Sequence, residues 1–250
     1  MLPILYGFIG FISGAVAAVL YNIIAGIRSG MGILAEMFLK NGNPVFGVEP
    51  DPVMRAGGEY YLRDNFSFTS IPAAVEATAL PDHAVKFVTA GQAFHWLDLE
   101  LTQREFTRIL VPGGWVVLVW NVQRAAGSPF QEALQRFWET EEFSKQATRQ
   151  ASEHMKRVQA YRLNFERARQ ELLTPFFAPG GFKEKVFENP LVVDFEALKG
   201  RILSNGPALE PGDPLFGTML AALEEIFRAH EENGTVTIEH DTRLVYGYLW

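Results

Sequence analysis

The sequence predicts an α/β protein with a doubly wound, Rossmann-like and mostly parallel sheet, extended by a helical insertion and a C-terminal β-hairpin. Between residues 23 and 120, five apolar runs of strand length alternate with segments of helical spacing. The last run, Trp115–Trp120, is apolar throughout, which is typical of a central parallel strand covered on both faces. With 250 residues, 48% of them hydrophobic, the chain can bury the core of one such domain with additions.

The first predicted unit of the sheet combines a strand over Ile23–Ile27, a glycine-bearing turn over Arg28–Gly32, a helix over Ile33–Lys40 and a strand over Val45–Val48. Such a turn presents backbone N–H groups at a helix N-terminus, where they can hold an anionic or dipolar group. Glu49 follows the second strand, at the position where these folds hold a ribose through its hydroxyls. The alternative is an ordinary βα turn without a ligand, because the first of the three glycines of a dinucleotide turn is missing.

Three further strands complete the predicted parallel part. Phe66–Ile71 alternates apolar with small polar residues, Ala84–Thr89 is a short apolar run, and Trp115–Trp120 follows. Helices over Val53–Leu62 and Leu99–Leu110 connect these strands. The character of the chain changes after this part, so we expect a Rossmann-like core over 23–125.

Residues 126–250 are expected to form the substrate side and to add strands to the sheet. Phe130–Phe177 is charged and helical in spacing, as in blocks that cover an active-site mouth or form a partner surface. The remaining expected elements are a strand over Phe182–Phe187, helices over Phe195–Leu203 and Leu215–Glu232, and a hairpin of Thr235–Glu239 and Arg243–Leu249 turned at His240–Thr242.

Charge and cysteine content exclude several classes of partner and site. The chain has 22 Lys and Arg against 29 Asp and Glu, a net charge of -7, so it lacks the basic balance typical of nucleic-acid binding. The absence of cysteine excludes disulfides, cysteine-ligated zinc and cysteine nucleophiles. Glu139–Glu142 has no histidine at helical spacing, so we expect a solvated helix face and no metal site. A small molecule or a protein is the expected partner.

Residues 1–27 contain no charged residue and no histidine. The run exceeds the roughly 20 apolar residues that span a bilayer, and Gly10 and Gly14 form a G-x-x-x-G pair. We therefore expect a transmembrane helix, with the rest of the chain in the cytoplasm because Arg28 and Lys40 follow the run. The alternative is a buried helix leading into the sheet. The segment Ile23–Ile27 cannot serve both as the end of the span and as the first strand.

Five segments occur in an order and at spacings typical of a known family. They are S-G-M-G-I-L-A-E-M-F-L from Ser29, V-F-G-V-E-P-D from Val45, V-E-A-T-A-L-P-D from Val75, F-V-T-A-G-Q-A-F-H-W-L-D from Phe87 and R-I-L-V-P-G-G-W-V-V-L-V-W-N from Arg108. From about residue 23 to its C-terminus, the chain resembles the class I S-adenosylmethionine-dependent methyltransferases, in particular the type 11 branch. This resemblance implies an enzyme that transfers a methyl group from S-adenosylmethionine to a small organic acceptor.

The resemblance also implies which residues hold the cofactor. Gly30 and Gly32 would line its methionine end, and Glu49, followed by Pro50, would hydrogen-bond the ribose hydroxyls. A side chain at either glycine would block close approach of a ligand to the backbone.

The adenine and the reacting methyl group would lie further along the chain. The resemblance places Val75 and Glu76 at the adenine, Gly91 beside the sulfonium and Gln92 facing the acceptor. A methyl group on a sulfonium is already activated, so alignment of the acceptor and exclusion of water supply most of the rate. His95 is a candidate base if the acceptor must lose a proton; the alternative is a structural histidine packed on its neighbour Trp96.

Three residues of the cofactor turn depart from the family pattern. The family usually has an acid at the position of Gly26, a glycine at that of Arg28 and a small polar residue at that of Met31. Arg28 either pairs with the methionine carboxylate or obstructs the pocket. A second hypothesis is therefore a catalytically impaired, membrane-tethered binding module. A nicotinamide-dependent dehydrogenase is disfavoured by Arg28 and by the downstream motifs.

Overall fold

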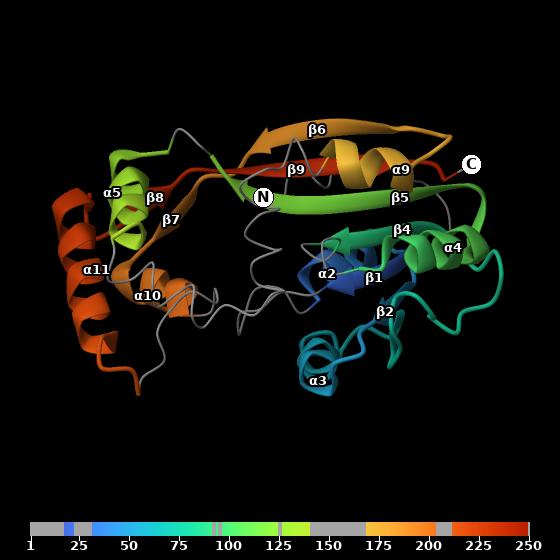
Figure 1. Cartoon of the computed structure of the whole chain (residues 1–250). Coiled ribbons are helices and arrows are strands. Elements are labelled where there is room, and N and C mark those ends of the chain that lie inside the picture. Colours follow the sequence, from blue (N-terminus) through green and yellow to red (C-terminus); the bar gives the residue numbers. More distant parts are fainter. Residues whose placement is uncertain are drawn as a thin grey trace.

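The computed structural model describes residues 18–22, 32–91, 94, 97–124, 127–140, 169–203 and 212–249. Within these ranges, seven strands form one sheet in the order β3-β2-β1-β4-β5-β9-β6. Figure 1 shows the long strands β5, β9 and β6 side by side. The strands are β1 (Ala18–Asn22), β2 (Val45–Val48), β3 (Phe68–Ile71), β4 (Val85–Gly91), β5 (Leu110–Gln123), β6 (Phe182–Glu188) and β9 (His240–Gly247). Neighbours from β3 to β5 are parallel and β9 is antiparallel to both its neighbours. The predicted doubly wound, mostly parallel α/β sheet is confirmed.

The first strand lies earlier in the chain than predicted. β1 comprises Ala18–Asn22 rather than Ile23–Ile27, and pairs with β2 from Ala18 opposite Val45 and with β4 up to Asn22 opposite Gly91. The run of residues 1–27 has no charged residue and is apolar on both sides of Asn22, so its composition alone could not fix the position of a strand within it.

This strand also bears on the predicted transmembrane helix over 1–27. Ala18–Asn22, near the end of the predicted span, is an extended strand in the middle of the sheet, so a helix over the full segment is wrong for these residues. Among the residues that the structure describes, no helix combines the length and apolar character needed to cross a membrane.

The predicted C-terminal hairpin is not formed. Thr235–Glu239 corresponds to β8 (Val236–Ile238), which pairs with β7 (Leu191–Val193) in a separate small sheet. His240–Thr242, expected as a turn, is extended within β9 and pairs with β5. Only Glu239 separates β8 from β9, which is too short for the two-residue loop of a hairpin.

Several helices, but not all, begin where the sequence supplies a capping side chain. α2 (Ile33–Lys40) has the predicted bounds and carries a Glu36–Lys40 ion pair at 2.8 Å. α3 (Pro52–Tyr61) and α4 (Leu99–Ile109) start after Asp51 and Asp98, whose carboxylates accept from backbone N–H groups of the first turn. These three helices connect parallel strands, so their N-termini all lie at the carboxyl edge of the sheet.

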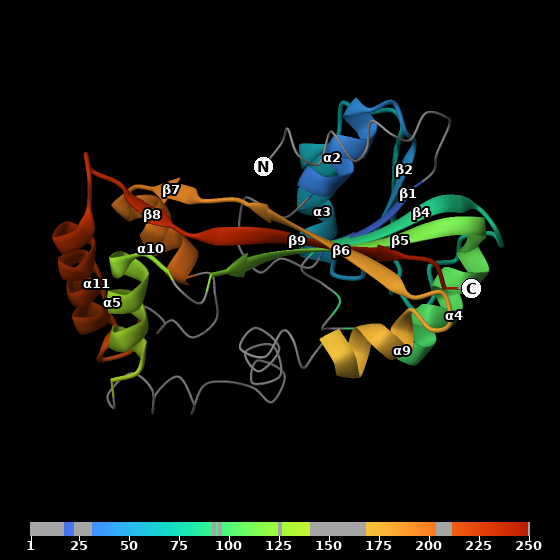
Figure 2. The same ribbon diagram turned by 90° about the horizontal axis from the view of Figure 1, so that it is seen from above.

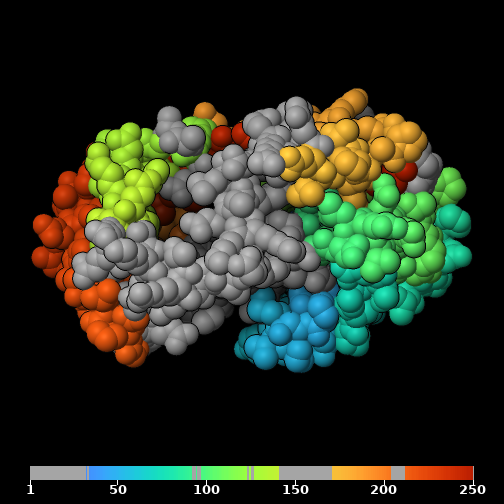
Figure 3. All heavy atoms as spheres, viewed as in Figure 1, coloured from blue at the N-terminus to red at the C-terminus, as the bar shows by residue number. Residues whose placement is uncertain are grey.

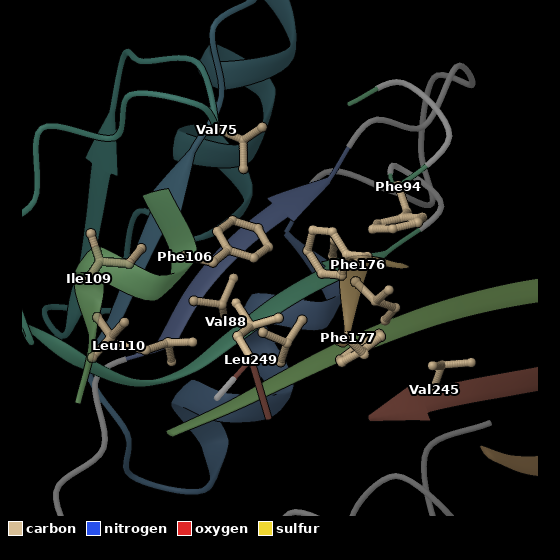
Figure 4. Packing of buried hydrophobic residues seen from close by; sticks show 14 of the residues in the cluster. Val75, Val88, Phe94, Phe106, Ile109, Leu110, Phe176, Phe177, Val245 and Leu249 are labelled. Atoms are coloured by element: carbon tan, nitrogen blue, oxygen red, sulfur yellow. The ribbon is translucent and has the colours of Figure 1, made fainter. Parts of the chain in front are cut away.

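The sheet is covered on both faces, as Figure 2 shows: α2 and α3 lie on one side, α4 and α9 (Thr174–Phe176) on the other. The larger core lies under α4 and α9. Figure 4 shows Phe94, Phe106, Phe176 and Phe177 gathered there against the sheet. The Phe94 and Phe176 rings meet edge to face at 4.8 Å, a favourable geometry for buried aromatic rings.

A second lobe lies beyond the carboxyl end of β5, at the left of Figure 1. It contains α5 (Pro129–Trp138), α10 (Phe195–Leu203), α11 (Phe216–His230) and the β7–β8 sheet, packed around their own apolar clusters. α10 has the predicted bounds. The central part of the predicted helical block Phe130–Phe177, residues 141–168, lies outside the described residues; the block ends in η2 (Arg169–Leu173), a π-helical turn, and α9.

Gln131 joins this lobe to the main sheet. Its buried amide accepts from the N–H of Glu239 at 2.7 Å and donates to the Glu239 carbonyl at 3.2 Å. The side chain thus satisfies both backbone groups of the residue between β8 and β9. It also completes a capping box with Ser128 at the start of α5.

We predict that Gln131→Leu lowers the free energy of unfolding by about 1–3 kcal/mol, because the Glu239 N–H loses its partner, whereas the Glu239 carbonyl still accepts from the Arg124 N–H at 3.1 Å. Chemical denaturation measures this change. Gln135→Leu, on the same helix but bonded only to the exposed side chain of Glu139, is the matched control and should change stability by less than about 0.5 kcal/mol. Equal losses in the two variants would contradict the prediction.

Candidate cofactor-binding site at the carboxyl edge of the sheet

The candidate site lies where the strand order reverses. β1 and β4 are neighbours, but the chain leaves β1 toward β2 on one side and leaves β4 toward β5 on the other. Asn22 at the end of β1 pairs with Gly91 at the end of β4, and Glu49 follows β2 directly at the same edge. Open α/β sheets bind ligands at such a switch point, beyond the carboxyl ends of the strands.

Glu49 is held in a defined orientation at this edge. Its N–H donates to the Ile71 carbonyl at 3.1 Å, which extends the β2–β3 ladder by one bond. Its Oε1 accepts from the Asp51 N–H at 3.0 Å. Burial raises the pKa of the Glu49 carboxyl, and repulsion from Asp51 adds to this, whereas the Asp51 N–H and the Arg55 charge act in the opposite direction.

Asp51 and Pro52 explain why the chain turns sharply after Glu49. Asp51 accepts from the N–H groups of Val53 and Met54 at 2.9 and 2.8 Å, and Pro52 occupies the first turn of α3, where its missing N–H costs nothing. Pro50 is exposed between the two carboxylates. Asp51-Pro52 is a helix-start signal, and α3 accordingly begins one residue before the predicted Val53.

Gly32 caps α2 with a left-handed backbone, at a φ of 97°. A Cβ there would lie 3.0 Å from Tyr61 Cδ1 and 3.1 Å from Leu62 Cδ1. Backbone conformation and the packing of α2 against the end of α3 therefore both require glycine at this position. These two constraints hold without any ligand, so they are separate from the close approach of a cofactor that the sequence analysis had considered.

Several predicted residues lie outside the described ranges. They are Gly30 with the three departures Gly26, Arg28 and Met31 in the cofactor turn, and Gln92 and His95 after β4. Gly91 is described and ends β4 beside β1 and β5, opposite Val119. Within the described residues, no group of three His, Asp or Glu side chains is arranged to hold a metal ion.

Val75 and Glu76 lie together in the loop after β3. Val75 is fully buried in the larger core, so neither its side chain nor its backbone is exposed at the edge. Glu76 Oε1 accepts from the Asp98 N–H at 3.2 Å, which ties this loop to the start of α4.

The same loop is anchored by a buried carboxylate that the sequence analysis missed. Glu105 on α4 accepts from the N–H and the hydroxyl of Thr78 at 2.8 and 2.5 Å, and pairs with Arg108 at 2.8 Å. Burial alone would raise the pKa of Glu105, but the bonds from Arg108 and Thr78 together outweigh it and lower that pKa. Arg108 also donates to the Leu80 carbonyl and to Asp82, both at 2.7 Å.

The comparisons with known proteins agree with this geometry. Residues 27–118 match a family described as a methyltransferase domain. An uncharacterised methyltransferase of Mycobacterium tuberculosis is 33% identical over 98 residues, which is 39% of each chain. The chain thus matches about two fifths of the length of this relative.

Two solved structures share the fold over nearly the whole chain. A protein described as a type II methyltransferase from Anaeromyxobacter dehalogenans has a TM-score of 0.58 and 18% identity, covering 97% of this chain and 93% of that one. The YcgJ protein from Bacillus subtilis has a TM-score of 0.56 and 14% identity, covering 97% and 96%. The fold is that of the class I methyltransferases. Residues 27–118, which match the methyltransferase-domain family, make up less than half of the chain.

We predict that Glu105→Gln lowers the free energy of unfolding by about 1–3 kcal/mol at neutral pH, because Arg108 and Thr78 lose a charged partner. The pKa of Glu105 is lower in the folded chain than its ordinary value of 4.5. Its contribution is therefore present above about pH 4.5 and lost as the pH falls through the folded-state pKa.

Thermal and urea unfolding across this pH range measure the difference between Glu105→Gln and the wild type. Glu100→Gln, which removes an exposed carboxylate paired with Arg104 on the same helix, is the control. The prediction fails if Glu105→Gln is no more destabilising than Glu100→Gln, or if its effect grows as the pH falls.

Proposed function

We propose that the protein transfers a methyl group from S-adenosylmethionine to a small organic acceptor. The observation that carries this proposal is the placement of Glu49, an oriented and half-buried carboxyl group, at the switch point of a methyltransferase fold. The match of residues 27–118 to a methyltransferase domain supports the same reaction class.

The residues present fit the cofactor that this reaction needs. The Asp51 N–H uses one lone pair of Glu49 Oε1, and an ionised carboxylate retains further acceptor sites for the two ribose hydroxyls. The anchored loop containing Val75 and Glu76 borders the same edge and would flank the adenine. Gly91, without a side chain, leaves room beside the end of β1 for the sulfonium end of the cofactor.

The chemistry asks the protein mainly for alignment. Bound S-adenosylmethionine would supply a methyl group that is already activated, because it is attached to a positively charged sulfur that leaves as a neutral thioether. The chain's own residues must hold the acceptor in line and exclude water. We place the acceptor between the carboxyl edge and the lobe of α5, α10 and α11, because β5 and β9 extend past the partner of Gly91 and support that lobe beyond the edge.

We predict that the wild-type chain binds S-adenosylhomocysteine with a micromolar Kd, about -8 kcal/mol, in calorimetric titration. Glu49→Gln should weaken this binding about tenfold or more, because charge-assisted hydrogen bonds to the ribose are lost. Asp64→Asn removes an exposed carboxylate that is paired only loosely with Arg63 at 3.8 Å and should leave the affinity unchanged.

Methyl transfer itself is tested with methyl-labelled S-adenosylmethionine and a panel of small amines, phenols and carboxylic acids. Failure of the wild type to bind either form of the cofactor would overturn the proposed function. Equal losses of affinity in Glu49→Gln and Asp64→Asn would contradict the assignment of Glu49 to the cofactor site.

A further inference from the structure

We propose that Arg55 is a positioning residue for Glu49: it holds the backbone at the end of β2 and places a positive charge beside the carboxyl that would receive the ribose hydroxyls. This inference rests on the proposed function. It assigns a role to a side chain that neither the glycine turn nor the strand ends had singled out.

Arg55 contacts the end of β2 directly and β3 through Glu59. Its Nη1 donates to the Glu49 carbonyl at 3.3 Å, six residues back along the chain. Its Nε lies 3.6 Å from Glu59 Oε1, and that same oxygen accepts from the Ser70 hydroxyl at 2.6 Å. Arg55 therefore links the end of β2 through Glu59 to β3, and a change at Arg55 reaches Glu49 through its main chain.

These polar contacts matter because α3 has little apolar anchoring. None of its residues is buried, and Val53 and Tyr60 are 77% and 71% exposed. Figure 3 shows this helix as the blue group of spheres protruding from the body of the molecule. The orientation of its first turn, and with it the Asp51 N–H that holds Glu49, thus depends on the Asp51 cap and on Arg55.

Arg55 contributes the positive charge that offsets the negative charge of Asp51 beside Glu49. Among the residues that the structure describes, the charged groups that act on its carboxyl are Asp51, which repels the ionised form, and Arg55, which stabilises it. Burial already disfavours the ionised form. Within this described set, removing the Arg55 charge leaves burial and repulsion opposed by the Asp51 N–H alone, so Glu49 takes up a proton at higher pH. A protonated carboxyl has fewer acceptor sites for the two ribose hydroxyls.

The test follows S-adenosylhomocysteine binding by calorimetry from neutral pH down to about pH 5. The variants are Arg55→Gln, Arg55→Lys and, as a control on the same side of the protein, Arg63→Gln, whose side chain lies over Tyr60. Arg55→Gln should move the pH midpoint of binding upward and weaken binding about two- to fivefold in the acidic range, the effect of one partly exposed charge. Arg55→Lys should retain the wild-type midpoint, and Arg63→Gln should match the wild type throughout.

A second readout separates electrostatics from misfolding. The carboxyl ¹³C signal of Glu49, assigned by its loss in Glu49→Gln, should titrate at higher pH in Arg55→Gln than in the wild type. Unchanged midpoints for both binding and the carboxyl signal would overturn the role of Arg55 while leaving the proposed function standing. Absence of binding by the wild type at every pH would instead overturn the proposed function and this inference together.

Discussion

The pairing of β5 with β9 is the constraint on which the rest of the structure depends. The two strands pair from Val116 opposite Gly247 to Gln123 opposite His240. Their first half lies in the apolar core, where Val116 and Leu118 face one cluster and Val117 and Val119 the other. Because the backbone ladder continues past the end of β4, the second half supports a lobe that is packed around a core of its own.

Beyond the core, polar side chains take over the work of holding the strands together. The Thr242 hydroxyl on β9 donates to Asn121 Oδ1 on β5 at 2.8 Å, and Asn189, directly after β6, donates to Thr242 at 3.0 Å. These bonds join β5, β9 and β6 where the apolar contacts end. Directly after the end of β5, Arg124 pairs with Asp241 at 2.7 Å and with Glu188 at 3.1 Å. Hydrogen bonds between neighbouring strands depend on direction, so this junction fixes the orientation of the lobe more closely than apolar packing would.

How far the sequence predicted the structure depended on whether an element had polar boundaries. Ile33–Lys40 lies between Gly32 and Asn41-Gly42, and Val45–Val48 between Pro44 and Glu49, and both were predicted to the residue. The first strand ends at Asn22 but lies between apolar residues on both sides, and it was placed five residues too late.

The candidate site was predicted in the same uneven way. Glu49 could be found because it follows a strand, a relation that is local in sequence. The Thr78–Glu105 contact joins residues that are 27 positions apart, so no local pattern announces it. The same holds for the apparent hairpin at the C-terminus, where alternation predicted the strands but could not reveal that β8 pairs with β7 and β9 with β5.

The carboxyl edge gains its character from the ends of helices. α2, α3 and α4 all begin there, capped by Gly32, Asp51 and Asp98. Their unpaired N–H groups and dipoles make the edge favourable for negative charge, although burial disfavours a carboxylate. Glu49 takes part in this balance directly, since it accepts the Asp51 N–H just before α3. A half-buried carboxylate can therefore stand at the end of β2 without a fully buried cation as partner, and its remaining acceptor sites stay available for a ligand that donates hydroxyl groups.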